Sequence, residues 1–253
     1  MEYKDLPFKI PVESPTYEAD SAFVIQQVSG ILEQRRRCGD NRIILNTNLK
    51  SGLPLENINK LAGPLVELWA YEVFSGIRDQ ADNAFSLINV EAQDRLDMAD
   101  IILQFKKGEH VITGNVDVKA TSDDISLGGK SPNVTSFARI RTAYVVDPDF
   151  IFVILSLRHK VYSERSEKTG LMNWIMEISG CHAYDLKYLS DADICYNPAL
   201  GTGQIQVKDI HYVSHQKRTT WEMCRLLDAK YLKSKKRSLS DFVTLAKRME
   251  WIK

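Results

Sequence analysis

Two acidic residues and one lysine in the middle of the chain could form a small charged cluster. Asp100 lies in an apolar stretch, Ala99–Phe105, and Asp117 and Lys119 lie near the end of a second one, Val111–Ala120. A polar segment with a glycine separates the two stretches, which is the pattern of a β-hairpin. Because side chains alternate along a strand, Asp117 and Lys119 are expected to project from the same face.

The position of the turn decides whether the two acids meet. If the chain turns between Gly108 and Glu109, Asp100 faces Asp117 on the neighbouring strand. Two carboxylates and one ammonium group would then converge. A bulge at Gly114 would shift this register by one residue, and we expect the register without the bulge.

Such a cluster has a definite chemical use. Two carboxylates bind a hard cation such as Mg²⁺, and the backbone carbonyl of Val118 can add a third oxygen. The metal polarises a phosphoryl oxygen and lowers the pKa of a bound water, while Lys119 orients that water and offsets developing charge. These groups suit the hydrolysis of a phosphodiester. The catalytic candidates are Asp100, Asp117 and Lys119, and the candidate metal ligands are Asp100, Asp117 and Val118.

The pattern of an acid, any residue and a lysine also occurs at Glu2–Lys4, Asp185–Lys187 and Asp228–Lys230. No acid precedes the first of these copies. The last lies in a helical pattern, where residues two apart point in roughly opposite directions. No acid-bearing apolar strand lies close to Asp185–Lys187. The copy at Asp117 is therefore the best candidate, and its alternative is an ordinary strand with solvated charges.

Four short blocks of the sequence resemble a known nuclease family. They are Gly63-Pro64-Leu65-Val66-Glu67, Ala99-Asp100-Ile101-Ile102-Leu103, Asp117-Val118-Lys119 and Ser131-Pro132-Asn133-Val134-Thr135-Ser136. The two acids and the lysine stand where PD-(D/E)XK nucleases have their metal-binding motif, although Ala99 replaces its proline. More narrowly, the chain resembles type II restriction endonucleases of the HincII and HpaI kind. The likeness to the HpaI kind extends over most of the chain.

The resemblance implies a type II restriction endonuclease that cuts double-stranded DNA with Mg²⁺ as cofactor. It implies blunt cutting, with 5′-phosphate ends, of a six-base-pair palindrome close to GTTAAC. A cognate DNA methyltransferase is expected in the same system, without a stable complex. Because a symmetric site needs two active sites, we expect a homodimer. The alternatives are a non-sequence-specific or repair nuclease of the same superfamily and a non-catalytic DNA-binding module.

A further acid comes from a predicted helix at Leu61–Ile77. Glu67 lies off the apolar stripe of this helix, and in the resembling nucleases a glutamate on the helix before the hairpin faces the metal site. We therefore add Glu67 to the catalytic candidates, with Glu72 as its rival and a surface glutamate as the plain alternative. Three more acids before the first strand are interpreted as loop residues: Glu91, Asp94 and Asp97.

The resemblance also implies that two polar segments contact DNA. The first follows Lys119 as a loop rich in Ser, Gly and Asp and leads into a predicted helix at Asn133–Val145; the second is the turn-rich segment Asn197–Gln204. Asn, Gln and Ser can bind base edges, and Arg can anchor phosphate. The candidates are Lys130, Ser131, Asn133, Ser136, Arg139, Arg141, Thr202 and Gln204. The alternatives are plain connecting loops and, for the two arginines, ion pairs with Asp147 or Asp149. Asp124 stands where a phosphate-binding P-loop needs glycine, so nucleotide binding is rejected.

Composition limits the class of protein. The chain has 253 residues with 44% hydrophobic side chains, enough for one substantial core, and no apolar run long enough to cross a membrane. Its cysteines are scattered and its first residues are charged, so we expect a cytoplasmic protein. Lys plus Arg and Asp plus Glu both number 33, but Gly201–Lys253 contains twelve basic and five acidic residues. Such a basic segment can hold DNA by its charge, or it can be a solvated helical surface.

The fold class follows from the order of the elements. Helical spacing marks Ser21–Arg37, and a continuous apolar run marks a buried strand at Phe150–Leu157. Thr219 and Glu222 form a capping box for a helix to about Leu232, and a last helix starts at Ser240. We therefore predict an α/β fold in which helices flank a mixed central β-sheet, and the resemblance implies that the core is of the PD-(D/E)XK type. Residues 1–253 are expected to form one catalytic and DNA-binding domain with a basic helical part at about 218–253.

Overall fold

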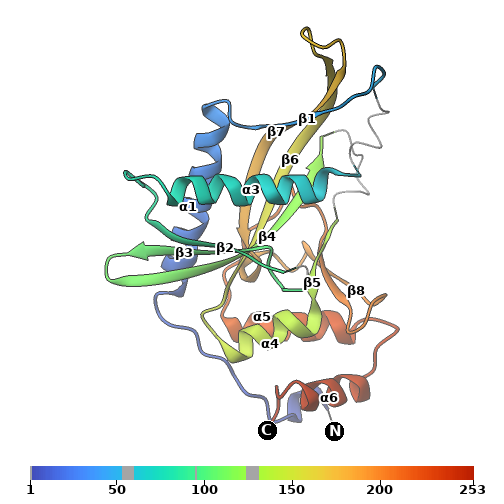
Figure 1. Ribbon diagram of the computed structural model, residues 1–253. Coiled ribbons are helices and arrows are strands. Elements are labelled where there is room, and N and C mark those ends of the chain that lie inside the picture. The colour runs from blue at the N-terminus through green and yellow to red at the C-terminus, as the bar shows by residue number, and fades with distance from the viewer. Residues whose placement is uncertain (1, 53–59, 95, 124–130) are drawn as a thin grey trace. The chain divides into compact units, whose positions relative to one another are not determined.

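The computed structural model describes residues 2–52, 60–94, 96–123 and 131–253, which form two compact units (Figure 1). Unit 1 comprises Met1–Ser21, Lys130–Phe152 and Asp185–Lys253. Unit 2 comprises Ala22–Gly129 and Val153–Tyr184. The single catalytic and DNA-binding domain that the sequence predicts stays a prediction.

A mixed six-stranded sheet forms the centre of unit 2 and confirms the predicted fold class. In the order of the sheet its strands are β1 (Arg42–Asn46), β7 (Met172–Asp185), β6 (Ile151–Arg165), β4 (His110–Ser122), β3 (Ile101–Lys107) and β2 (Leu87–Ala92). β1 pairs antiparallel with β7, and β2 and β4 both pair antiparallel with β3. The predicted buried strand is the first part of β6, where every residue from Ile151 to Leu157 is buried.

The β3–β4 hairpin has the register that the sequence predicts. Facing residues run without interruption from the pair Ile101 and Val116 to the pair Lys107 and His110. The turn between the strands contains Gly108 at φ +61°, a conformation that glycine adopts without strain. This short turn fixes which residues meet at the open end of the hairpin.

Gly114 lies within the unbroken β3–β4 ladder, so the bulge considered there is absent. A Cβ atom at Gly114 would lie 2.7 Å from Cγ1 of Val24 on helix α1 (Tyr17–Arg37). The ring of Phe23, on the same helix, meets the ring of Phe105 edge-on at 6.2 Å between centroids. The missing side chain at Gly114 therefore allows α1 to approach the hairpin closely.

Helix α3 (Ala62–Arg78) runs across the sheet, with contacts to β1, β2 and β4 (Figure 1). It confirms the predicted helix to within one residue at each end. Pro64 lies in its first turn, where a missing N–H costs little. At the start of the helix Ala62 packs with Val161 and Met176 in a buried cluster. This packing holds α3 against the sheet, and α3 carries Glu67.

Two details of the approach to the hairpin differ from the prediction. Strand β3 begins at Ile101 rather than at Ala99, because its pairing with β2 ends at the pair Ala92 and Ile101. Glu91, interpreted as a loop residue, lies within β2. Asp94 and Asp97 do lie in the connection from β2 to β3.

The described residues of unit 1 include a three-stranded antiparallel sheet and three complete α-helices. The strands are, in sheet order, β5 (Asn133–Ser136), β9 (Gln204–Val207) and β8 (Ile194–Asn197), and the helices are α4 (Phe137–Val146), α5 (Thr220–Leu232) and α6 (Leu239–Arg248). The prediction of a helix from Asn133 was therefore wrong for its first turn. Residues 133–136 pair with β9 instead, and the helix begins at Phe137.

Both C-terminal helices begin with reciprocal capping contacts. The Thr219 side chain accepts from the amide of Glu222, and the Glu222 carboxylate accepts from the amide of Thr219, which confirms the predicted capping box. Ser238 and Asp241 repeat this arrangement at α6. The last helix thus begins at Leu239, one residue earlier than predicted.

A buried ion pair lies in the core of unit 1. The guanidinium of Arg141 on α4 donates to both carboxylate oxygens of Asp228 on α5, at 3.1 and 3.2 Å, and both side chains are fully buried. The Tyr3 hydroxyl donates to the same carboxylate at 2.7 Å. The guanidinium also lies 4.8 Å from the ring centroid of Trp251, near the C-terminal end of the chain. One charged contact therefore connects two helices and both ends of the chain.

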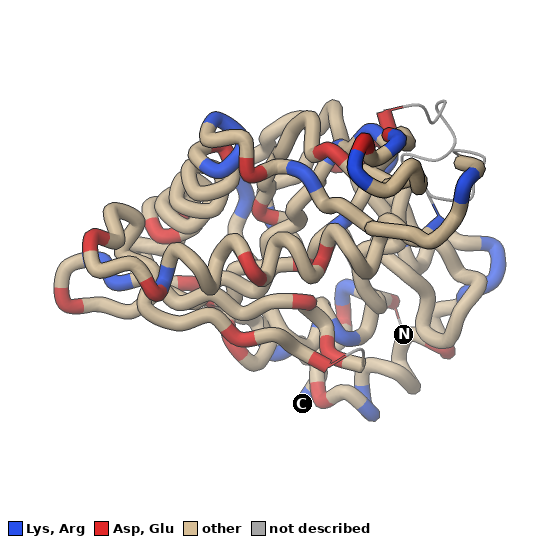
Figure 2. Tube along the Cα trace, turned by 45° about the horizontal axis from the view of Figure 1, so that its top comes forward, with Lys and Arg blue, Asp and Glu red and all other residues tan. Residues whose placement is uncertain are grey.

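Charges of both signs are dispersed along the chain trace (Figure 2). Several basic residues of the C-terminal part have partners within unit 1: Lys217 contacts Glu18, and Arg218 pairs with Asp191 at 3.0 Å. Part of the excess basic charge is therefore used in internal contacts. Within the described ranges, none of the helices combines the length and the apolarity that a membrane span requires.

Candidate metal centre and nucleic-acid interface

Asp100 is fixed at the open end of the β3–β4 hairpin. Its amide donates to the carbonyl of Val116 at 2.9 Å, and its Oδ2 accepts from the amide of Val118 at 2.6 Å. Asp100 lies just before the first residue of β3. Its side chain therefore accepts the hydrogen bond from β4 that a further residue of the strand would otherwise accept. It brings the Asp100 carboxylate next to the segment that contains Asp117, as the predicted register requires.

Asp117 is a buried acid with one oxygen paired and one oxygen unpaired. Its side chain is 4% exposed, and its Oδ1 accepts from the Lys119 ammonium at 2.7 Å. Its Oδ2 is buried and has no hydrogen-bond partner among the described residues. Burial raises the pKa of Asp117 to about 7; Lys119 opposes this shift, and the carboxylates of Asp100 and Glu67 add to it. A buried acid oxygen without a partner is costly unless a cation or a proton satisfies it.

Glu67 on α3 interacts electrostatically with the same cluster. Burial raises its pKa, the Asp100 carboxylate raises it further, and the Lys119 ammonium lowers it. The side chain therefore lies within electrostatic reach of both residues. The rival Glu72 is exposed, and its orientation on α3 differs from that of Glu67. Of the two glutamates, Glu67 is the one that the structure places beside the cluster.

The residues of this cluster fit a divalent metal ion. Asp117 offers an unpaired buried oxygen, and the Asp100 carboxylate, which the Val118 amide holds, lies within electrostatic reach of Asp117. In the described part of the chain, no three His, Cys, Asp or Glu side chains are gathered closely enough to form a complete ligand set. Mg²⁺ typically uses one or two carboxylates and completes its shell with waters and substrate phosphates. The donors present therefore match Mg²⁺ better than a metal that needs an all-protein site.

The raised pKa of Asp117 predicts a pH-dependent stability of the metal-free protein. With a pKa of about 7 in the folded state and an ordinary value of 3.8, the folded protein holds a proton that the unfolded chain releases between these pH values. The free energy of unfolding therefore falls as the pH rises through this window. Asp117→Asn removes this penalty, so we expect it to stabilise the protein more at pH 8 than at pH 4.

Thermal unfolding in EDTA measures this difference. The gain at pH 8 should amount to a few kcal/mol at most, since one pKa unit corresponds to about 1.4 kcal/mol. Comparing the variant with the wild type at each pH cancels the titration of the other acids. An equal difference at both pH values would show that Asp117 titrates normally.

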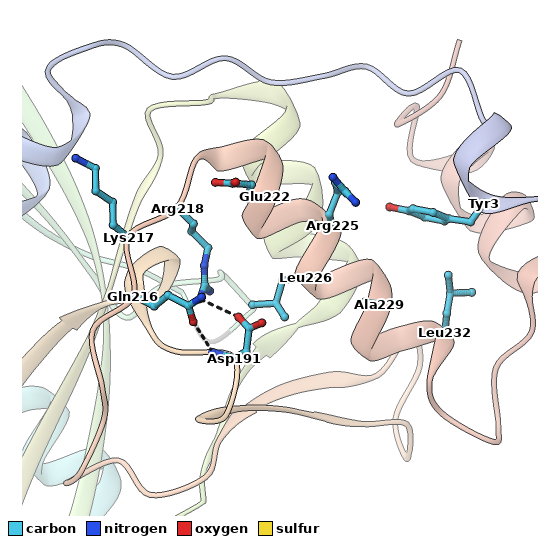
Figure 3. A pocket seen from close by; sticks show the side chains of 10 residues that line it. All are labelled: Tyr3, Asp191, Gln216, Lys217, Arg218, Glu222, Arg225, Leu226, Ala229 and Leu232. Atoms are coloured by element: carbon cyan, nitrogen blue, oxygen red, sulfur yellow. Dashed lines mark hydrogen bonds and ion pairs between the residues drawn. The ribbon is translucent and has the colours of Figure 1, made fainter.

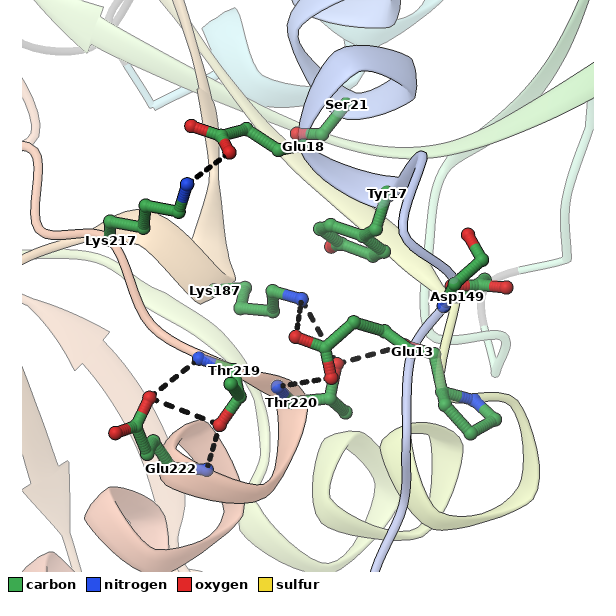
Figure 4. A network of polar contacts seen from close by, with 12 residues as sticks. Glu13, Tyr17, Glu18, Ser21, Asp149, Lys187, Lys217, Thr219, Thr220 and Glu222 are labelled. Atoms are coloured by element: carbon green, nitrogen blue, oxygen red, sulfur yellow. Dashed lines mark hydrogen bonds and ion pairs between the residues drawn. The ribbon is translucent and has the colours of Figure 1, made fainter.

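The copy of the acid-x-lysine pattern at Asp185–Lys187 has a structural role. Asp185 is buried and accepts hydrogen bonds from the hydroxyls of Tyr17 and Ser21, at 2.8 and 2.6 Å. Figure 4 shows that Lys187 instead reaches Glu13, at 3.3 Å, and it also contacts Thr220. The two charges of this copy thus have different partners. The copy at Asp228 is likewise used in the buried pair with Arg141.

Five of the candidate DNA-contacting residues lie on or beside the small sheet of unit 1. Asn133 on β5 accepts from the side-chain amide of Gln206 on β9 at 2.9 Å, and Ser136 at the end of β5 contacts the Thr202 hydroxyl at 3.0 Å. Gln204 faces Ser136 across β5 and β9. Ser131 donates to the carbonyl of Lys208. Segments that are far apart in the sequence thus meet in one polar region.

The polar side chains of this sheet alternate with buried ones. Gln204 and Gln206 of β9 are partly exposed, whereas Ile205 and Val207 are buried. Across β8 and β9, Asn197 faces Gln204. Gln204 was a candidate from the sequence, whereas Gln206 was missed and Asn197 was included only as the start of the turn-rich segment. Side chains alternate between the two faces of a strand, so Gln206, two residues after Gln204, is expected on the same exposed face.

The remaining DNA candidates have different surroundings. Arg139 is exposed on α4. Arg141 is fully buried and bonded to Asp228, which corrects its prediction as a phosphate contact and also its alternative pairing with Asp147 or Asp149. Lys130 lies outside the described residues.

Comparison with known proteins shows that the chain is similar to nucleases. A sequence model of the family described as "Type II restriction endonuclease HpaI" matches residues 4–250. The chain is also 65% identical to the type II restriction enzyme HpaI of Haemophilus parainfluenzae, over the full length of both chains. The chain belongs to the HpaI family of type II restriction endonucleases. It is therefore an enzyme of the site-specific deoxyribonuclease class, as the resemblance implied.

Membership of the HpaI family gives the cluster a chemical context. Type II restriction endonucleases act on double-stranded DNA and generally use divalent metal ions. In this HpaI-family chain, the cluster of Asp100, Asp117, Lys119 and Glu67 lies within unit 2, and the polar sheet lies within unit 1.

A cavity of about 560 Å³ in unit 1 contains none of the candidate residues. It lies along α5, between Tyr3 and residues 216–218 (Figure 3). Arg218 pairs with Asp191 in its wall, and the side chain of Gln216 accepts from the amide of Asp191 at 3.2 Å. These polar groups of the wall therefore bond to one another. The candidate metal centre of this HpaI-family enzyme does not lie in this cavity.

Proposed function

We propose that the protein uses Mg²⁺ to hydrolyse double-stranded DNA at a specific site, leaving a 5′-phosphate and a 3′-hydroxyl at each cut. The observation that carries this proposal is the buried, unpaired Oδ2 of Asp117 beside Asp100 and Lys119. When bound, Mg²⁺ supplies positive charge that polarises the scissile phosphate and makes water a better nucleophile at neutral pH. Asp100 and Asp117 would hold it, with the carbonyl of Val118 as a third ligand.

The other groups of the cluster have separate tasks in this mechanism. Lys119 orients the attacking water and offsets the negative charge that develops on the phosphate. Glu67 has a raised pKa and lies near both Asp100 and Lys119, which suits a group that orients water at the edge of the cluster. The hydrogen bond from the Val118 amide keeps the Asp100 carboxylate in place during the reaction.

We further propose that the polar region of unit 1 contacts the DNA. Side-chain amides such as those of Asn133 and Gln204 can form paired hydrogen bonds with adenine, and hydroxyls such as those of Ser131, Ser136 and Thr202 can bind bases or phosphates. Arg139 and Lys130 would add phosphate contacts.

The proposal also covers the DNA sequence, for which the support is the family, and the assembly and location of the enzyme. The site is a six-base-pair palindrome close to GTTAAC, and it is cut bluntly at its centre. A symmetric site favours a homodimer, whose two active sites cut the two strands. The enzyme acts in the cytoplasm, where a cognate DNA methyltransferase protects the host sites without forming a stable complex with it.

Gln204→Ala is expected to reduce discrimination between sequences. Loss of one base contact of this kind costs about 1–3 kcal/mol. The ratio of kcat/KM at the cognate site to kcat/KM at single-base variants should fall by a corresponding factor of about 5 to 150. Lys253→Ala, at the exposed C-terminus of the same unit, serves as the control. An unchanged ratio in Gln204→Ala would remove this residue from the interface.

Digestion of a defined plasmid with Mg²⁺, followed by sequencing of the ends, tests the proposal directly. Discrete fragments with blunt 5′-phosphate ends at one palindrome would support it. A smear of fragments would instead indicate a nuclease without sequence preference. Binding without cutting at any Mg²⁺ concentration would indicate a non-catalytic DNA-binding module.

A further inference from the structure

Arg237 connects the linker after α5 to the turn between β8 and β9. Its Nε donates to the Tyr196 hydroxyl at 2.9 Å, and its Nη2 donates to the carbonyls of Pro198 and Gly201 at 3.2 and 2.7 Å. Its guanidinium also lies 5.4 Å from the ring centroid of Tyr231 on α5. One side chain thus bonds to both sides of this turn.

The contacts continue from Tyr196 into the residues after the turn. Burial raises the pKa of Tyr196, so its hydroxyl stays protonated, and it donates to the carbonyl of Thr202 at 2.8 Å. The Thr202 hydroxyl contacts Ser136 at 3.0 Å and accepts from the amide of Ala138 at 3.4 Å. At Gly203, with φ +92°, an added Cβ would lie 2.2 Å from the Tyr196 ring. The turn therefore has little freedom to move while these bonds persist.

We infer that Arg237 is a positioning residue for sequence discrimination, which holds the turn that leads into Thr202 and Gln204 without contacting a base itself. The inference rests on the proposed function, because it takes the polar region of unit 1 as the part that contacts DNA. Recognition by side chains needs their donors and acceptors within a few tenths of an ångström of the base edges. A turn released from Arg237 would place these groups less accurately.

The bonding of Arg237 favours this role over a phosphate contact. Three N–H groups of the guanidinium are used by the Tyr196 hydroxyl and the two carbonyls, and these acceptors lie in different directions. The planar, forked shape of arginine matches such a set, whereas the ammonium of lysine is a single point that cannot span it. Lysine at this position would keep the positive charge, but it could not form all three hydrogen bonds of Arg237.

Three variants separate geometry from charge. Arg237→Ala removes both, Arg237→Lys keeps only the charge, and Lys235→Ala removes an equal charge from the same linker, at an exposed position. Cleavage rates are measured at the site that end sequencing identifies and at duplexes with one base pair changed. We expect both Arg237 variants to lower the ratio of cognate to altered-site kcat/KM by about tenfold to a hundredfold. Lys235→Ala should leave this ratio unchanged.

Tyr196→Phe removes the hydroxyl that connects Arg237 to Thr202. We expect it to lower the same ratio, and its combination with Arg237→Ala to lower the ratio by less than the product of the two single effects. Each variant is compared at a temperature at which its unfolding curve shows it fully folded. A loss of stability alone then leaves the discrimination ratio unaffected.

Two results would overturn the inference. One is full recovery of discrimination by Arg237→Lys. The other is a uniform loss of affinity in Arg237→Ala at all sequences, with a weaker salt dependence and an unchanged ratio, which is the behaviour of a phosphate contact. If Gln204→Ala also leaves the ratio unchanged, the proposed DNA contact of this region fails. If Gln204→Ala lowers it while the Arg237 variants do not, only the role of Arg237 is rejected.

Discussion

Asp117→Ala is expected to bind its DNA site and to cut it at least about a thousandfold more slowly than the wild type. The variant loses the only buried carboxylate of the cluster, with its unpaired Oδ2, and leaves Lys119 without its 2.7 Å partner. Lys119→Ala should give a loss of similar size, because the charge that develops on the phosphate is no longer offset. Cleavage under single-turnover conditions and binding in Ca²⁺ give the two quantities separately.

Two glutamates on α3 provide a matched control for this prediction. Glu67 interacts electrostatically with the cluster and Glu72 is exposed, so Glu67→Gln should slow cleavage and Glu72→Gln should leave it unchanged. The two changes remove the same charge from the same helix. Cutting at the wild-type rate by Asp117→Ala or Lys119→Ala would refute the assignment of the active site. Equal losses in the two glutamate variants would instead point to a general effect of charge.

The second large effect is expected on stability. Asp228→Ala leaves the buried guanidinium of Arg141 without its carboxylate, and uncompensated buried charges of this kind cost about 3–5 kcal/mol. The Tyr3 hydroxyl loses its 2.7 Å partner in the same variant. We therefore expect a large decrease in the free energy of unfolding, measured by urea denaturation.

A surface ion pair of unit 1 is the control. Glu250→Gln removes the partner of Lys9 in a pair whose side chains are 83% and 45% exposed, and it should cost less than about 1 kcal/mol. Arg141→Met combined with Asp228→Leu should recover much of the lost stability, because it removes both charges. A decrease for Asp228→Ala as small as that for Glu250→Gln would show that Arg141 finds another partner.

The hairpin and its acids could be predicted from the sequence because their contacts are local. A turn at Gly108 joins β3 to β4 directly, so its position alone sets the register that brings Asp100 to Asp117. The role of Gly114 could not be inferred in this way. Its missing side chain accommodates Val24 on α1, and no local pattern indicates which helix covers the strand.

The surroundings of the other candidate residues were harder to predict because their partners are distant in the sequence. Arg141 lies four residues after Phe137 and three before Tyr144, on the buried side of α4, but its charge is typical of a surface residue, and only the fold brings Asp228 to it. Residues 133–136 have no strong strand pattern and become a strand by pairing with β9, more than sixty positions away. The acid-x-lysine copy at Asp185 shows the same limit, since its buried partners Tyr17 and Ser21 come from the start of α1.

The most direct test of the metal centre is a crystal structure of the wild-type enzyme with its DNA site and Mn²⁺, in which anomalous scattering locates the metal. We expect an anomalous peak in contact with carboxylate oxygens of Asp100 and Asp117 and with an oxygen of the scissile phosphate. A peak away from these two residues, beside the phosphate to be cut, would contradict it.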